Sequence, residues 1–244
     1  MNDTERLTLE RVYTPGTQPG QWPMRDVSLS VKAGAALGVL SPDRADLDQL
    51  FAVIAGHEPL ARGRIRLDGT PIERLDPAQR VRRGIGVTPA LAGMAHETVE
   101  ALIGAAASHQ SRHAGGDRAH RFNVAMRFSR LSPWRAHTVT HLPLGQRAAL
   151  RLALALTGLP KLILLPRPAH GLMAEERPYL VELLHRLCRE GVSLLIDEPD
   201  LETLIGVCPE LVVLHHGRII AAGSPDSLGT QADVLGVFAG PPAA

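Results

Sequence analysis

The chain lacks a large net charge, a long apolar run and a supply of lysine. Its net charge of +1 in 244 residues gives no support to the binding of nucleic acid or of a membrane surface. No run approaches about 18 uncharged apolar residues, so we expect no membrane-spanning segment. Lys32 and Lys161 are the only lysines among 26 basic residues, so a mechanism that needs a lysine has two candidates.

Cysteine is equally scarce. Cys188 and Cys208 stand alone in a chain without a secretory signal, which predicts reduced thiols and a cytoplasmic location. The motifs G-x-S-x-G, C-x-x-C and H-E-x-x-H are absent from the sequence, so hydrolase and thiol-redox functions have no support. What the chain does contain is enough apolar sequence, 45% of its residues, to bury a sizeable core.

Hydrophobic patterning predicts strands that alternate with helices. The expected strands are 7–13, 26–31, 35–40, 64–69, 162–165, 193–196, 211–214 and 218–222. The expected helices are 50–55, 97–107, 118–130, 146–158, 175–189 and 201–207. Loops are expected at 15–23, at 41–49 and at 111–117. Such alternation predicts a mostly parallel sheet that is covered on both faces.

Four segments resemble the ATPase domain of ATP-binding cassette (ABC) transporters in sequence, order and spacing. They are 25-RDVSLSVKAG-34, 62-RGRIRLDGTPI-72, 160-PKLILL-165 and 211-LVVLHHGRIIAAGSP-225. The resemblance implies an α/β fold of the P-loop NTPase type, with a mostly parallel core sheet and an N-terminal antiparallel β region. It also implies a single domain over 1–244, with a helical subdomain inserted at 90–145.

Within that family, three further segments resemble the ATPases of branched-chain amino-acid importers. They are 79-QRVRRGIGV-87, 142-LPLGQ-146 and 234-VLGVFAG-240. The resemblance therefore favours the import of branched-chain amino acids or similar small solutes as the transport process concerned.

The family's phosphate loop, G-x-x-x-x-G-K-[ST], falls on residues 41–48. Its backbone N–H groups close on phosphate, its lysine reaches the β- and γ-oxygens, and its hydroxyl holds Mg²⁺. The positions of the two glycines, the lysine and the hydroxyl are occupied here by Ser41, Asp46, Leu47 and Asp48. We therefore expect the usual mode of triphosphate binding to fail.

The charge of this segment points the same way. Asp43, Asp46 and Asp48 outnumber the single cation Arg44. At an effective dielectric of ~20, a like-charge pair 4 Å apart costs about 4 kcal/mol, which exceeds the ~1 kcal/mol of a residual hydrogen bond. We interpret Asp46 or Asp48 as a cap of the following helix, with a new ligand or metal site as the alternative.

The resemblance places the family's Mg²⁺-associated aspartate and its catalytic glutamate at Pro166 and Arg167. Proline has no side-chain oxygen and arginine stays cationic, so neither can act as a general base. The family's switch histidine falls on Pro199, and its D-loop aspartate falls on Met173. We expect no catalytic residue at these positions.

The segment 194-LLIDEP-199 looks like the same acidic motif one strand later. Its distance from the signature segment does not fit the family, whereas that of Pro166 does. Asp197 and Glu198 are left with two interpretations, a cation site at a strand end or a solvated turn, and we favour the turn.

Three other family positions are altered or ambiguous. The Q-loop glutamine falls on Pro89 or Ala90, and Tyr13 stands near the aromatic residue that stacks on adenine. The signature remnant consists of Leu142, Pro143, Leu144, Gly145 and Gln146. Proline takes the place of the signature serine, which removes both a hydroxyl and an N–H group.

His109 and His113 have the i,i+4 spacing that suits zinc on a helix. The sequence offers no clear third ligand and a Gly-Gly pair follows them, so we favour surface histidines and predict no metal site.

We conclude from the sequence that the chain is a degenerate ABC ATPase subunit, a pseudo-ATPase with a structural or regulatory role. We expect no cofactor, since ATP and Mg²⁺ serve the family but their ligands are missing here. The implied partners are permease subunits and a second ATPase subunit, which would hold the chain at the inner face of the membrane. Two alternatives stay open: an active import ATPase that uses Arg44, Arg167, Asp197 and Glu198, and a free-standing scaffold.

Overall fold

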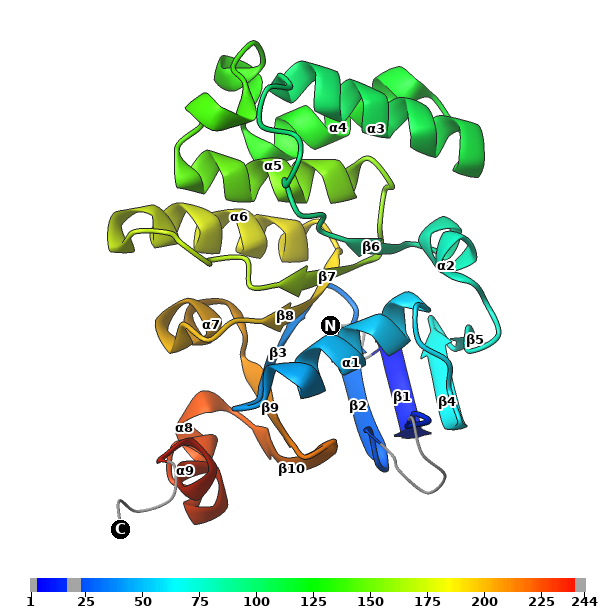
Figure 1. The fold of residues 1–244 in the computed structure, drawn as a ribbon, viewed down its shortest axis with the longest axis vertical. Helices are drawn as coiled ribbons and strands as arrows, with labels where there is room; N and C mark the ends of the chain where they lie inside the picture. Colours follow the sequence, from blue (N-terminus) through cyan, green and yellow to red (C-terminus); the bar gives the residue numbers. More distant parts are fainter. Residues whose placement is uncertain (1–3, 17–22, 240–244) are drawn as a thin grey trace.

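The computed structural model describes residues 4–16 and 23–239, and its strands form two sheets (Figure 1). The antiparallel sheet has the order β2 (Val27–Lys32), β1 (Glu5–Tyr13), β4 (Arg62–Leu67) and β5 (Thr70–Pro71). The core sheet has the order β10 (Arg218–Gly223), β9 (Glu210–His215), β3 (Ala36–Leu40), β8 (Ser193–Asp197), β7 (Leu162–Pro166) and β6 (Ile85–Val87). The predicted combination of an antiparallel N-terminal sheet and a separate core sheet is confirmed.

The core sheet is parallel except at one edge. Strands β6, β7, β8, β3 and β9 run parallel, and β10 pairs antiparallel with β9. Residues Leu162–Leu165 of β7 are all buried, because helices cover both faces of a parallel sheet. By contrast, β2 alternates buried Val27, Leu29 and Val31 with more exposed neighbours, as expected of a strand with one face on the core.

Nine α-helices lie among the described residues. They are α1 (Arg44–Ala55), α2 (Pro77–Arg83), α3 (Val99–Ala114), α4 (Arg118–Ser129), α5 (Leu144–Leu156), α6 (Arg177–Arg189), α7 (Leu201–Val207), α8 (Pro225–Leu228) and α9 (Ala232–Ala239). Short 3₁₀ turns occur at 132–134, 139–141 and 174–176. None of the helices described has the length and apolar character needed to cross a bilayer.

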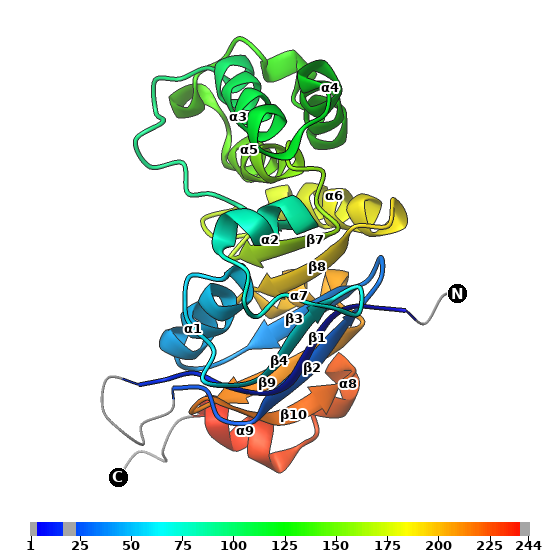
Figure 2. The ribbon, with the colours of Figure 1, turned by 90° about the vertical axis from the view of Figure 1, so that its right-hand side faces the viewer.

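Side chains on the two faces of the core sheet belong to two hydrophobic clusters. One cluster joins the antiparallel sheet and α1 to one face, through residues such as Leu37 and Val39 of β3. The other joins α3 to α7 to the opposite face, through Leu194 and Ile196 of β8. Two views place α3 and α4 at one end of the molecule, and α8 and α9 toward the other (Figures 1 and 2).

Two expectations about local structure were wrong, and helix α2 was not predicted. Residues 44–49 are helical, so the expected loop 41–49 shrinks to residues 41–43, because Asp43 caps the helix earlier than predicted. Residues 111–114 continue α3 and are not part of a linker. Helix α2 was not predicted, although Asp76 and Gln79 form a capping box with Pro77 at the first helical position. The predicted loop 15–23 lies largely outside the described residues.

Candidate functional site

The carboxyl ends of β3, β7 and β8 meet at one edge of the core sheet, where ligands bind in open α/β folds. After β3, the three residues Ser41–Asp43 lead directly into α1. Asp43 is the N-cap, and its Oδ1 accepts a hydrogen bond from the N–H of Ala45 at 2.9 Å. A loop of three residues without glycine offers no cradle of backbone N–H groups around a phosphate chain.

Asp46, which stands at a glycine position of the family's loop, is buried at 8% exposure. Its Oδ1 accepts a hydrogen bond from the N–H of Gly217 at 3.0 Å, and the hydroxyl of Ser41 donates to its Oδ2 at 3.4 Å. Asp46 therefore ties the start of α1 to the β9–β10 turn. A substituent at Gly217 would have no room, since an added Cβ would lie 1.8 Å from the carbonyl oxygen of Pro23.

Arg44 is held by two carboxylates. Its Nη2 lies 2.7 Å from Oδ1 of Asp48, and its Nη1 pairs with Oδ2 of Asp197 at the end of β8. The side chain of Asp197 is 3% exposed, whereas that of Asp48 is 61% exposed. Burial raises the pKa of Asp197, and the positive charge of Arg44 opposes that rise. The one cation of the degenerate loop is thus already neutralised within the chain.

The end of β7 carries Pro166 and Arg167, where the family has its acids. Arg167 has a left-handed backbone with φ of 47°, and its N–H donates to the carbonyl oxygen of Asp197 at 2.7 Å. Arg151 of α5 donates to the carbonyl oxygens of Pro89 at 3.1 Å and Pro166 at 3.0 Å. Burial lowers the pKa of the Arg151 guanidinium, and Glu198 opposes that shift. Pro166 and Arg167 carry no carboxylate themselves, and the nearby acids Asp197 and Glu198 come from the end of β8.

Glu198 holds the loop that follows β7. Its Oε2 accepts from the N–H of Ala169 at 2.7 Å, and its Oε1 accepts from the N–H of Asp200 at 3.1 Å. Asp197 and Glu198 are each 2% exposed, so the expectation of a solvated turn was wrong. Both carboxylates are structural acceptors, and the described residues include no group of three or more His, Cys, Asp or Glu side chains that could hold a metal ion.

The signature remnant opens α5, whose N-cap Pro143 provides no side-chain hydrogen bond. Instead, Oε1 of Glu176 accepts from the N–H of Gly145 at 2.8 Å. Its other oxygen, Oε2, accepts from the N–H of Met173 at 3.1 Å. Leu142 is buried, Leu144 is exposed and Gln146 is partly exposed. A carboxylate of the chain itself therefore covers the positive end of this helix.

Glu176 and Gly217 were not predicted as residues of the site. Glu176 stands three residues after Met173, which is the spacing of a capping box but without its Ser or Thr. Gly217, which donates a hydrogen bond to Asp46, lies 171 residues further along the chain, and no local pattern links the two residues.

A pocket of ≈ 220 Å³ lies among these groups. Ser41, Arg44, Leu47, Arg167 and Asp197 contribute to its wall. Pro199 also lines it, so the structure brings together the altered phosphate-loop, acid and switch positions. Tyr13 lies elsewhere, at the end of β1, where it pairs in register with Arg62. Its contact with adenine stays a prediction.

The histidine pair lies on successive turns of α3. The ring centroids of His109 and His113 are 4.3 Å apart. Since the described residues bring no third ligand to them, this pair supplies no argument for zinc. Burial raises the pKa of Cys188 to about 11 and that of Cys208 still further, so both thiols are protonated at neutral pH.

We expect the variant Arg44→Met to lose about 2 kcal/mol of unfolding free energy at pH 7. Breaking a buried pair costs ~3–5 kcal/mol, and Arg44 is itself 41% exposed, so screening reduces the loss. Removal of the opposing charge raises the pKa of Asp197 further above its unfolded value. Protonation of Asp197 therefore restores stability at low pH, and the deficit appears as pH rises through its native pKa.

Urea unfolding of both proteins between pH 4 and pH 8 measures this difference. The matched control Asp48→Asn breaks the exposed half of the network and is expected to change stability by less than about 0.5 kcal/mol. A deficit that stays constant with pH would contradict the assignment of a buried Arg44–Asp197 pair.

Comparisons with known proteins identify the family. The model of the family described as ABC transporter matches residues 24–169, which is more than half of the chain. A probable ABC transporter ATP-binding protein of Azorhizobium caulinodans is 28% identical over 226 residues, covering 91% of this chain and 79% of that protein. The lipopolysaccharide export system ATP-binding protein LptB of Escherichia coli is 28% identical over 222 residues, covering 91% of this chain and 92% of LptB.

Solved structures agree on the fold. A nucleotide-free ATP-binding cassette from an ABC transporter superposes with a TM-score of 0.84 at 20% identity, over 97% of this chain and 100% of that chain. The ADP conformation of MJ1267, an ATP-binding cassette of an ABC transporter, gives 0.84 at 21% identity, over 97% of this chain and 99% of that chain. The chain therefore belongs to the ABC transporter family and has the α/β fold of that family's ATP-binding domain.

Proposed function

We propose that this chain is a nucleotide-binding-domain-like subunit of an ABC transporter that does not hydrolyse ATP. The observation that carries the proposal is that its own carboxylates cover both helix N-termini at which the family holds phosphate. Asp43 caps α1, and Glu176 accepts from Gly145 at the start of α5. A phosphate at either helix would meet a like charge, at a cost of about 4 kcal/mol at 4 Å and an effective dielectric of ~20.

The cations of the chain support the same proposal. Arg44 is paired with Asp48 and Asp197. Lys32 lies 3.3 Å from Glu210, and Lys161 lies 2.7 Å from Asp68. Neither lysine lines the ≈ 220 Å³ pocket. A phosphoryl-transfer site needs cations on the transferred group and an acid on the metal. In this pocket Arg44, Asp197 and Glu198 are engaged by partners within the chain, which leaves Arg167 as its cation outside an ion pair among the described residues.

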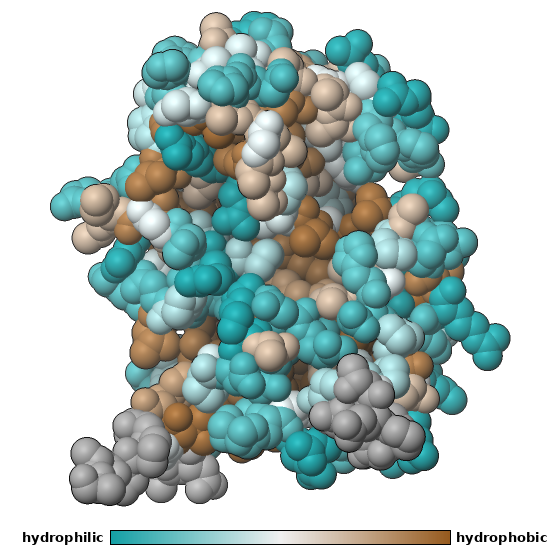
Figure 3. All heavy atoms as spheres, in the orientation of Figure 1, coloured by the Kyte–Doolittle hydropathy of each residue, from teal (hydrophilic) through white to brown (hydrophobic). Residues whose placement is uncertain are grey.

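An apolar hollow between α2 and the helices α3 and α5 supports the choice of partner. It measures ≈ 710 Å³ and is lined by residues such as Val81, Leu102 and Leu154. Figure 3 shows hydrophobic side chains gathered in a hollow at this level of the molecule. We propose that a permease subunit docks here, which would hold the chain at the cytoplasmic face of a membrane, beside a second ATPase subunit.

The domain arrangement is part of this proposal. We propose a single domain over 1–244 with the segment 90–145 as its helical subdomain. The hydrophobic cluster that includes Ile103 and Met126 continues without interruption to Ile163 and Leu194 of the core sheet, which supports one cooperative unit.

A second candidate is an active ATP-binding subunit that energises transport. It is favoured by the family match and by relatives described as ATP-binding proteins. Its cargo is open, because the segment 142-LPLGQ-146 resembles importers of branched-chain amino acids, whereas LptB is described as part of lipopolysaccharide export. This candidate would need Arg44, Arg167 and Glu198 to leave the contacts described above.

Isothermal titration of the full chain with Mg-ATP tests the two candidates. We expect no saturable heat up to about 1 mM nucleotide, because a Kd above that value corresponds to less than ~4.1 kcal/mol of binding free energy. We also expect the chain on its own to release no phosphate above the buffer rate. Micromolar binding, together with a phosphate-release rate that Glu198→Gln removes, would reject the pseudo-ATPase proposal in favour of the active subunit.

A further inference from the structure

A second pocket adjoins the first, shares Arg44 and Arg167 with it and has no carboxylate among its described lining residues. It measures ≈ 470 Å³ and lies between α5, the end of β7 and the segment after β6. Arginine and histidine side chains dominate its polar wall: Arg44, Arg147, Arg151, Arg167 and His170. No aspartate or glutamate is among its lining residues, since Asp197 and Glu198 line the neighbouring ≈ 220 Å³ pocket instead.

Within the described part of the chain, three of these arginines lie outside any direct ion pair, although Glu198 acts electrostatically on Arg151 and Arg167 acts on Asp197. Among the residues that the structure describes, Arg147, Arg151 and Arg167 form no ion pair, whereas Arg44 forms two. The guanidinium of Arg147 donates to the carbonyl oxygens of Leu142 at 3.0 Å and Thr140 at 2.9 Å. Carbonyl dipoles orient a guanidinium but leave its net charge in place. The described wall of this pocket therefore carries cations without a carboxylate, and Asp197 and Glu198 of the neighbouring pocket offset only part of that charge.

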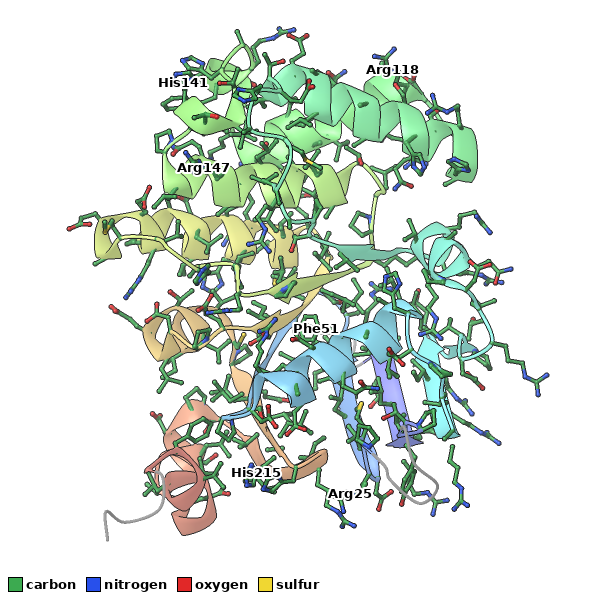
Figure 4. All side chains as sticks on the ribbon, viewed as in Figure 1. Arg25, Phe51, Arg118, His141, Arg147 and His215 are labelled. Atoms are coloured by element: carbon green, nitrogen blue, oxygen red, sulfur yellow. The ribbon has the colours of Figure 1, made fainter. Side chains whose placement is uncertain are left out.

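The carbonyl contacts also fix the geometry of the pocket. Arg147 and Arg151 lie four residues apart on α5, hence on the same face of that helix. Figure 4 shows where Arg147 leaves α5, far from the labelled Arg118 of α4. Because both guanidinium groups are anchored before any ligand arrives, little side-chain entropy remains to be lost on binding.

Arg167 adds a backbone feature. Its φ of 47° lies in the left-handed region, which non-glycine residues adopt at an energetic cost. The hydrogen bond from its N–H to Asp197 and the contact of its carbonyl oxygen with Arg151 at 3.4 Å hold it there. Its Nη2 lies 3.3 Å from Nδ1 of His170, another residue of the pocket wall.

We propose that this pocket is a binding site for a small organic phosphate. Guanidinium forks match the oxygens of a phosphate monoester, and a water molecule's share of liquid volume is only about 30 Å³, so ≈ 470 Å³ leaves room for an organic part. The apolar part of the wall, which includes Leu91, Leu144 and Ala148, provides the surface for it. The proposal goes beyond the pseudo-ATPase function, because α5 and the end of β7 form this site and the start of α1 contributes only Arg44.

Thermal unfolding of the full chain tests the site, with inorganic phosphate and glycerol 3-phosphate as probes and sodium chloride at matched ionic strength as the reference. We expect a saturable rise in Tm with both probes and tighter binding of glycerol 3-phosphate. Arg167→Gln is expected to weaken binding at least 10-fold. The matched control Arg118→Gln removes an exposed arginine on α4 and is expected to leave binding unchanged.

A second variant separates ligand binding from folding. Arg167→Gly removes the left-handed strain and is expected to raise the Tm without ligand while it abolishes the response to phosphate. The site is rejected if Tm rises equally with phosphate and chloride, or if Arg167→Gln and Arg118→Gln bind alike. Loss of folding in Arg167→Gly would also contradict the proposal, since it would make Arg167 a structural residue.

Discussion

Replacement of Glu198 by alanine should lower the free energy of unfolding by about 3 kcal/mol. Glu198 is 2% exposed and its carboxylate accepts hydrogen bonds from the N–H groups of Ala169 and Asp200. Hydrogen bonds to charged groups contribute ~1.5–3 kcal/mol each, and their loss leaves the N–H of buried Ala169 without a partner. Urea unfolding followed by circular dichroism measures the change.

Two matched variants test whether the lost stability of Glu198→Ala comes from the lost hydrogen bonds. Glu198→Gln keeps one oxygen acceptor and is expected to lose about 1–2 kcal/mol. Glu202→Ala, whose side chain is 85% exposed and lies 3.5 Å from Arg177, is expected to change stability by less than about 0.5 kcal/mol. If Glu198→Ala left stability unchanged but removed a measured ATPase rate, Glu198 would be catalytic and the pseudo-ATPase proposal would fail.

The largest effect is expected for Arg80→Met, at about 4 kcal/mol of unfolding free energy. Arg80 is 3% exposed and its guanidinium donates to carbonyl oxygens of Val53 at 2.5 Å, Ile54 at 3.0 Å and Leu75 at 3.0 Å. Val53 and Ile54 belong to the last turn of α1, which contains no basic residue of its own. Methionine fills most of the space but removes these hydrogen bonds, although the carbonyl oxygen of Val53 keeps a further donor, the N–H of Gly56 at 3.2 Å. It also removes the cation from the negative end of the helix.

The control is Arg82→Met, because Arg82 lies on α2, the helix that also carries Arg80. Arg82 is exposed, so its replacement should change stability by less than about 0.5 kcal/mol. Burial lowers the pKa of Arg80 and Glu73 opposes the shift, but the guanidinium stays charged at all usable pH values. The difference between the two variants should therefore be nearly the same at pH 5 and pH 8. Equal stability of both would contradict the role of Arg80 at the end of α1.

The architecture could be predicted because its signals are local. Buried strands such as Leu162–Pro166 are continuous apolar runs, and Leu201–Val207 has the predicted bounds of a short helix. The start of α1 could not be placed, because three aspartates within six residues are typical of a polar loop. Only the structure assigns Asp43 to the cap and Asp46 to the interior.

The identities of the residues at the altered family positions were readable in the sequence, but their partners were not. The pairing of Arg44 with Asp197 spans 153 positions, and that of Gly145 with Glu176 spans 31. Such contacts depend on the order of strands in the sheet and on the direction in which loops leave it. The sequence also made Asp197 and Glu198 look like a solvent-exposed turn, since buried carboxylates are rare and become tolerable only through partners supplied by the fold.

The hydrogen bond between Glu176 and Gly145 has a consequence for how the subunit responds to cellular nucleotide levels. The N-terminus of α5 is already covered by the carboxylate of Glu176. We therefore expect the conformation of α5 to be independent of the ratio of ATP to ADP. On the proposed function, this subunit keeps one conformation while a competent partner opens and closes beside it. Its conformation would then not depend on the cellular level of ATP, and it would serve as a fixed support for the subunit that moves.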